Sequence, residues 1–304
     1  MITVFLMPMR IEYLRYFKEA SRNFDVLIPE LAGSMGVIKF INNDGELDDA
    51  LLDVEIHDYK FMRKFLELLR DMSREGKRVI PLDPYGEYSM AIRSKYLLNK
   101  LSMGSLSDVQ KYIAYMEIHM ANIMREYSLA WSRHDFDKLV NLTIKYARAD
   151  SGRIRFRSEL RARSISKLLE EYGDANVMVQ ADYFNSVLIK YLQQRLNAEV
   201  RVIEAVSEAS KRLGILLNPQ PGYLLTMNYL NGKAMDPIEE RLLAARSVAY
   251  VSLRPRLVRL AGSNPDLLMV MENSLIGLLN TLDYDGCKSL FYRNQFKDLF
   301  KIKA

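Results

Sequence analysis

The sequence has few of the residues that build redox and zinc sites. Its 304 residues include one cysteine, Cys287, and three histidines, His57, His119 and His134. A single cysteine cannot form an internal disulfide, and the histidines show no metal-ligand spacing. The sequence also lacks the GxxxxGK[ST], GxGxxG, GxSxG, HExxH and paired CxxC motifs. These absences argue against nucleotide-driven, serine-hydrolase, zinc-peptidase and zinc-ribbon functions.

Long hydrophobic runs are also missing. No stretch reaches the roughly 18 apolar residues that a membrane span needs, and the apolar start ITVFLMPM is shorter than a signal peptide. With 49% hydrophobic and 27% charged residues, the chain has enough apolar material for a core. We therefore expect a folded cytoplasmic protein without a membrane partner. Few Gln and abundant Tyr, Arg and Glu favour a thermophilic source.

Charge is mildly positive and mostly well mixed, with a net value of +5. An acidic segment lies between Phe40 and Tyr59, and arginines crowd a later stretch: Arg148, Arg153, Arg155, Arg157, Arg161 and Arg163. Clustered arginines can bind phosphates, so this stretch is a candidate nucleic-acid surface. The alternatives are a solvated basic face, or pairing of Arg157 and Arg161 with Glu30 or Asp83.

The periodicity predicts an α/β fold with a largely parallel sheet and flanking helices. Short β-branched runs alternate with longer helical ones. Strands are expected at 3–7, 25–29, 78–82, 176–180 and 200–203, with 37–41 as a sixth candidate. Helices are expected at 11–22, 57–74, 108–131, 136–149, 157–172, 183–197, 236–254, 265–282 and 288–300.

The order of these elements predicts two regions. Residues 1–217 should form the α/β body, with a helical hairpin inserted at about 105–150. Residues 218–304 should form a helical C-terminal region, which begins after the turn signal NPQPGY.

Four predicted strands run directly into a carboxylate: Glu30, Asp83, Asp182 and Glu204. Parallel strands end at the same edge of a sheet, where open α/β folds bind ligands. Such a row of acids could hold a divalent metal or divide acid and base roles. Alternatively, each acid caps the helix that follows it. The first strand instead leads to Arg10, which could bind an anion or pair with one of the acids.

Two segments resemble the TraB-type superfamily, which includes TIKI, ChaN-like and erythromycin-esterase-like proteins. The opening VFLMPMRIEYLRYFKEASRNFDVLIPEL is similar to the family's first strand, helix and second strand, with Glu30 and Leu31 at its Glu-Leu ending. The segment RSELRARSISKLLEEYGDANVMVQADYFNSVLIKYL is similar to its arginine helix and second motif strand. Arg157 matches the family arginine.

The sequence departs from this family at the residues that carry its chemistry. Both Gly-x-x-His motifs are lost, since MPMR and QADY stand in their places, with Arg10 and Tyr183 at the two histidine positions. A mechanism that requires those histidines for metal ligation or proton transfer does not carry over.

The leading hypothesis is therefore a non-catalytic or altered TraB-like hydrolase relative with a degenerate pocket. Whether it is an enzyme is left open; if it is, the resemblance implies a hydrolase. The candidate catalytic residues are Glu30, Asp83, Arg157, Asp182 and Tyr183, and the candidate ligand-binding residues for an unknown small molecule are Arg10, Glu204 and Arg161. The alternative is a nucleic-acid-associated or partner-binding protein that uses Arg148–Arg163 and the C-terminal arginines Arg254, Arg256 and Arg259.

Overall fold

The computed structural model describes residues 2–54, 58–99, 102–172 and 175–299. The chain divides into two compact units. The first unit comprises Met1–Glu117 and Ile154–Gly214, and the second comprises Ile118–Arg153 and Ile215–Ala304. The first unit ends at Gly214, whereas the predicted end of the α/β body is residue 217. The predicted hairpin differs, because most of it belongs with the C-terminal helices rather than with the body.

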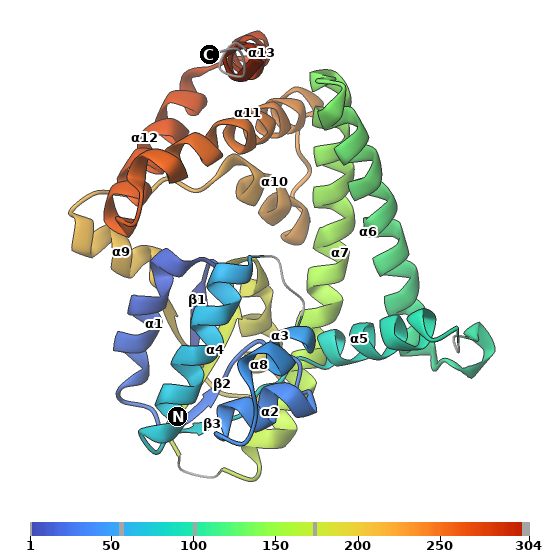
Figure 1. Cartoon of the computed structure of the whole chain (residues 1–304), viewed down its shortest axis with the longest axis vertical. Coiled ribbons are helices and arrows are strands. Elements are labelled where there is room, and N and C mark those ends of the chain that lie inside the picture. Colours follow the sequence, from blue (N-terminus) through green and yellow to red (C-terminus); the bar gives the residue numbers. More distant parts are fainter. Residues whose placement is uncertain (1, 55–57, 100–101, 173–174, 300–304) are drawn as a thin grey trace. The chain divides into compact units, whose positions relative to one another are not determined.

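The first unit is built on a five-stranded sheet whose pairs are all parallel (Figure 1). Its order is β3-β2-β4-β1-β5. The strands are β1 (Ile2–Met7), β2 (Val26–Ile28), β3 (Arg78–Val79), β4 (Val177–Asp182) and β5 (Arg201–Glu204). The predicted α/β class and parallel sheet are confirmed.

Helices cover both faces of this sheet because successive strand side chains point to opposite sides. On one face, Phe5 packs edge-on against Phe17 of α1 (Leu14–Ser21), and Phe17 packs against Phe65 of α4 (Tyr59–Arg74). On the other face, Val4 and Leu6 join Ala162 and Ile165 of α7 (Phe136–Leu169) and Leu188 of α8 (Val187–Leu196) in one buried cluster. The sheet is therefore buried on both sides, as parallel sheets require.

Short helices make the remaining connections of the first unit. They are η1 (Ile11–Tyr13), α2 (Met35–Ile41), α3 (Leu47–Leu52), α5 (Pro84–Leu97), η2 (Met103–Ser105), η3 (Tyr183–Ser186) and α9 (Ala205–Leu213).

The sixth candidate strand, 37–41, is wrong, because it lies in helix α2. The Ser34 side chain accepts from the Val37 N–H and caps this helix, while Val37, Phe40 and Ile41 are buried at helical spacing.

Two long helices pass through residues of both units: α6 (Asp108–Ser132) and α7 (Phe136–Leu169). The sequence predicted a break between 149 and 157, but α7 is continuous. Its polar side chains find partners inside the helix, since Arg153 pairs with Asp150 at 2.8 Å and the Ser151 hydroxyl donates to the Arg148 carbonyl. Continuity places Arg157 and Arg161 within one long helix.

The second unit is helical. It combines residues 118–153 with α10 (Pro221–Leu230), α11 (Pro237–Ala261), α12 (Pro265–Thr281) and α13 (Tyr284–Leu299). The predicted start at Pro237 is confirmed, with Asp236 accepting from the Ile238 N–H. Leu139, Val248, Leu279 and Phe291 contribute to its core. None of the described helices is long and apolar enough to cross a membrane.

Candidate functional site

The strand order creates one topological switch point, between β2 and β4. From β2 the chain continues to β3, on one side, whereas from β4 it continues to β5, on the other. The loops at the carboxyl ends of such neighbours separate and leave a crevice, which is where open α/β sheets bind ligands. Glu30 follows β2, and Asp182 ends β4.

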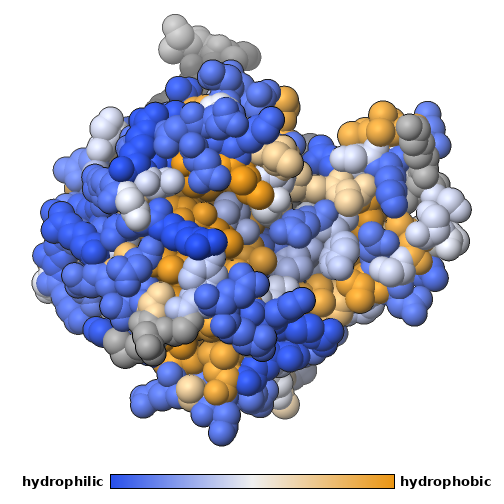
Figure 2. Space-filling view, turned by 90° about the horizontal axis from the view of Figure 1, so that it is seen from below, coloured by the Kyte–Doolittle hydropathy of each residue, from blue (hydrophilic) through white to orange (hydrophobic). Residues whose placement is uncertain are grey.

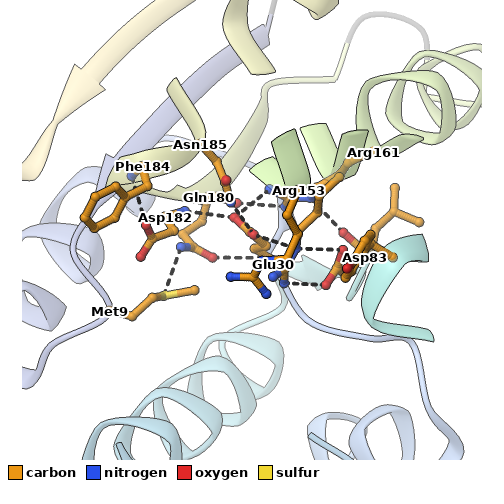
Figure 3. Close-up of polar contacts among 12 residues, drawn as sticks. Met9, Glu30, Asp83, Arg153, Arg161, Gln180, Asp182, Phe184 and Asn185 are labelled. Atoms are coloured by element: carbon orange, nitrogen blue, oxygen red, sulfur yellow. Dashed lines mark hydrogen bonds and ion pairs between the residues drawn. The ribbon is translucent and has the colours of Figure 1, made fainter. Parts of the chain in front are cut away.

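The Glu30 side chain fills this crevice and is almost completely buried. Its Oε1 accepts from Asn185 Nδ2 at 2.5 Å and lies 3.2 Å from Arg157 Nε. Its Oε2 accepts from the Asp182 N–H at 2.8 Å and from Arg161 Nη1 at 3.4 Å. Figure 3 shows Glu30 in the middle of this group. Both carboxylate oxygens are therefore occupied by partners within the chain.

Arg161 connects the carboxyl ends of three chain segments. Its Nε donates to the Leu82 carbonyl at 2.8 Å, and its Nη2 donates to the carbonyls of Ile28 at 3.1 Å and Gln180 at 2.8 Å (Figure 3). These carbonyls follow β3, end β2 and lie within β4. A planar guanidinium with five donors suits this task. The geometry thus gives Arg161 a structural role rather than the predicted contact with a ligand.

Arg157 joins the second acid to the same network. Its Nε donates to Asp83 Oδ1 at 3.2 Å and its Nη2 to Asp83 Oδ2 at 2.5 Å, while its guanidinium lies 5.8 Å from the Tyr85 ring centre. Gly86 makes room for the acid, since a Cβ there would lie 2.5 Å from Asp83 Oδ2. With 17% of its side chain exposed, Arg157 is the most accessible of the two arginines and two acids.

The charges of this network balance. Two buried carboxylates, Glu30 and Asp83, face two guanidiniums. Burial alone would raise the pKa of Glu30, but Arg157, Arg161 and the hydrogen bonds from Asp182 and Asn185 hold that pKa below its ordinary value. Glu30 is therefore ionised at neutral pH and is not poised to act as a general acid.

Of the two alternatives for Arg157 and Arg161, the structure shows pairing with strand-end acids rather than a solvated basic face. The capping interpretation is correct for Asp182, whose side chain accepts from the Phe184 N–H at 2.9 Å. The capping interpretation is wrong for Asp83. This residue precedes α5, but its side chain accepts a hydrogen bond from Arg157 and does not cap the helix. The interpretation is also wrong for Glu30, since Ser34 caps the next helix.

Three predicted site residues have other described contacts. Arg10 pairs with Glu12 at 3.0 Å, and Tyr183 packs against the buried cluster on the α7 and α8 face of the sheet. Glu204 accepts from Ser207 at 2.9 Å at the edge strand β5, and none of its described contacts reaches Glu30 or Asp83. The acids therefore do not form one continuous row.

Two members of the site were missed by the sequence analysis. The Gln180 side chain accepts from the Glu30 N–H at 2.9 Å, and Asn185 donates to the Glu30 carboxylate. Gln180 is the first residue of QADY, which stands in place of the second Gly-x-x-His motif. A buried amide within an otherwise apolar strand was the available signal, because such groups need partners.

The described residues contain no group of three His, Cys, Asp or Glu side chains that could hold a metal ion. Glu30 and Asp83 both pair with Arg157. A divalent cation bound by these two acids would therefore have to displace the Arg157 guanidinium. His119 and His134 are exposed, and His57 lies outside the described residues.

A protein from Archaeoglobus fulgidus described as uncharacterised is similar to this chain. The two share 25% identical residues over 288 positions, which cover 93% of this chain and 95% of that protein. The likeness therefore extends over both units. No family model matches the sequence, and no solved structure matches it.

Five arginines of the arginine-rich stretch have described contacts with acids. Arg157 and Arg161 belong to the buried network, Arg153 pairs with Asp150, and Arg163 lies 3.5 Å from Glu159. Arg148 pairs with Glu240 at 3.0 Å. Of the C-terminal arginines, Arg254 pairs with Glu272 and Arg256 donates to Asn294.

Proposed function

We propose that this chain is an altered relative of the TraB-like hydrolases, which retains the charged edge of the sheet for binding a small anionic ligand and lacks the hydrolytic reaction. The observation that carries the proposal is the 3.2 Å contact between Arg157 and Glu30. These residues come from the two separate segments of family resemblance. Their meeting at the β2–β4 switch point supports a common arrangement.

Loss of hydrolysis is supported by what occupies the motif positions. Arg10 and Tyr183 stand at the histidine positions, and neither can serve as the near-neutral base that an imidazole provides. Glu30 and Asp83 face guanidiniums rather than an open reaction site. The retained role is therefore binding.

The accessible cations favour a ligand that carries a carboxylate or phosphate group. Arg157 and Arg10 keep 17% and 15% of their side chains exposed. A guanidinium can add an anionic oxygen partner to an existing ion pair, and its fork matches both groups. The nucleic-acid alternative requires a continuous positive surface, and the pairing of individual arginines with nearby acids does not favour it.

The test uses inorganic phosphate and acetate as probes with the full chain, and reads the midpoint of thermal unfolding. Both anions should raise the midpoint of the native protein, because a ligand that binds only the folded state stabilises it. Arg157→Gln should abolish this rise. Arg163→Gln, on the same helix but in an exposed ion pair, should keep it.

Hydrolysis of p-nitrophenyl acetate is measured in parallel and should not exceed the buffer rate. If the purified native protein hydrolyses this ester faster than buffer and the Asp182→Asn variant does not, the chain is an active hydrolase. An unchanged midpoint with both anions would make the network purely structural and contradict ligand binding.

A further inference from the structure

A cavity of about 510 Å³ lies beside strand β3, at the edge of the sheet. One wall is helix α2, with Ile38 and Ile41, and another is the chain from Lys77 to Pro81, which contains β3. All of these residues belong to the first unit. Neither Glu30 nor Arg157 lines the cavity, so it is separate from the charged network. Its volume is within the range of ligand-binding pockets, about 300–1,000 Å³.

The backbone beside the cavity directs its hydrogen-bonding groups alternately toward β2 and away from it. The N–H groups of Arg78 and Ile80 donate to the carbonyls of Asp25 and Leu27, at 2.9 and 2.8 Å. In such a ladder the residue between them directs its N–H and C=O to the opposite side. Because β3 is the edge strand, the N–H and C=O of Val79 face out of the sheet, where Val79 lines the cavity.

Pro81 restricts what can pair with this edge. It is the next residue that faces away from β2, and proline has no N–H to donate. Its carbonyl is close to the chain after β2, since a Cβ on Gly33 would lie 3.2 Å from that oxygen. The edge therefore offers one outward residue with both a donor and an acceptor, which is Val79, and a partner strand has one register in which to use both.

Side chains add an apolar surface to these backbone groups. Arg78 lies 4.8 Å from the ring centre of Tyr172, and Ile80 packs against the buried cluster on the α7 and α8 face. By alternation, Val79 points to the other face, which carries α2 and α4. There Ile38 is 38% exposed and lines the cavity. Figure 1 shows α2 beside β3, and Figure 2, seen from the side on which these elements lie, shows hydrophobic surface between hydrophilic residues.

We propose that this cavity binds an extended peptide segment of a partner protein, which adds to the sheet beside β3. The segment would form two backbone hydrogen bonds with Val79, as peptides do when they extend a sheet edge. The residue opposite Val79 would direct its side chain to the same face and against Ile38, so an apolar residue is expected there. This site is independent of the proposed anion binding.

A second copy of this chain does not suit the same edge. Strand β3 has two residues, Arg78 and Val79, and Pro81 follows soon after. Short edge strands and proline are devices that prevent two sheets from pairing edge to edge. A single extended segment requires only the two groups of Val79 and the space beside them.

The experiment selects binders from a phage-displayed library of random heptapeptides on the immobilised full chain. Enriched heptapeptides, made synthetically, should bind the native protein in isothermal titration calorimetry. Val79→Pro should weaken this binding by about tenfold, the effect of losing one hydrogen bond. This substitution removes the outward N–H and keeps the bonds from Arg78 and Ile80 to β2. No enrichment on the native chain, or equal binding to Val79→Pro, would overturn the proposal.

Two further measurements keep the test decisive if Val79→Pro does not fold. Ile38→Glu should weaken binding at least about tenfold, whereas Leu52→Glu is the control, since Leu52 is 84% exposed on α3 and outside the cavity. A heptapeptide methylated at one backbone nitrogen at a time should lose binding to the native protein at one inner position. Native affinity of every methylated peptide would exclude pairing with the strand, and native affinity for Ile38→Glu would place the peptide elsewhere.

Discussion

The Arg161 guanidinium lies 3.4 Å from the Glu30 carboxylate, and both side chains are about 1% exposed. An ion pair removed from water in this way contributes little net stability compared with an apolar pair, but breaking it is costly because one charge stays buried. The pair therefore makes the edge of the sheet sensitive to single substitutions.

Replacing Arg161 by Lys should destabilise the protein although the charge is kept. The Lys ammonium cannot reach the carbonyls of Leu82, Ile28 and Gln180 together, and each lost charged hydrogen bond costs about 1.5–3 kcal/mol. We expect a loss of about 3–5 kcal/mol in the free energy of unfolding, measured with urea. Arg163→Lys is the control and should change it by less than about 1 kcal/mol. Equal effects of the two variants would contradict the structural role of Arg161.

Glu30 should make stability depend on pH in the acid range. Its folded pKa is lower than its ordinary value, so the stabilisation is complete above the unfolded pKa of about 4.3 and is lost as the pH falls through the folded pKa. In Glu30→Gln this component is absent, and unfolding free energies measured below pH 5 should fall less steeply than in the native protein.

At neutral pH, Glu30→Gln should be less stable by about 3–5 kcal/mol, because Arg161 is left with a buried charge. The exposed Glu159→Gln should show the native pH profile. An identical acid slope in Glu30→Gln would mean that Glu30 titrates normally in the folded state.

Gly86→Ala should disturb the contact between Asp83 and Arg157. The new methyl group would lie 2.5 Å from Asp83 Oδ2, a distance that requires the carboxylate to move. Overpacking of this kind costs about 1–3 kcal/mol. Gly277→Ala is the matched control in helix α12, where the added methyl group meets nothing within 4 Å, and it should stabilise by about 0.5–1 kcal/mol. Chemical denaturation of both variants provides the measurement.

Cys287 should react slowly with thiol reagents in the native protein. Its side chain is fully buried in the helical unit, and burial raises the pKa of the thiol to about 11. At pH 8 about one thiol in a thousand is then ionised, and only the thiolate attacks. Reaction with Ellman's reagent should become fast in denaturant. Rapid labelling under native conditions would indicate local opening around α13.

The sequence predicted the parallel sheet and the acids at its carboxyl edge, and it left the pairing of two arginines with these acids as an alternative to a solvated basic face. Strand ends and helix periodicity are local signals, and parallel pairing then brings Glu30 and Asp83 to one edge. Residues 37–41 were misassigned because a short β-branched run fits both a strand and a buried helix face. The Ser34 cap decides between them.

Other features depend on contacts that a sequence pattern does not contain. The carbonyls that Arg161 bridges carry no side-chain signal, so its structural role could not be read from residue types. Asn185 was indistinguishable from an ordinary polar residue at a helix start. The continuity of α7 depends on the partners of Asp150 and Ser151 inside the helix.

The alternation of the chain between its two units limits how the protein can be divided into fragments. The chain passes from one unit to the other within α6, within α7 and after Gly214. A single cut at any position therefore leaves at least one unit incomplete. A fragment that ends near residue 214 would contain the sheet and also Ile118–Arg153, which belongs to the helical unit. The two units are interleaved along the chain, so no single cut separates them into two complete pieces.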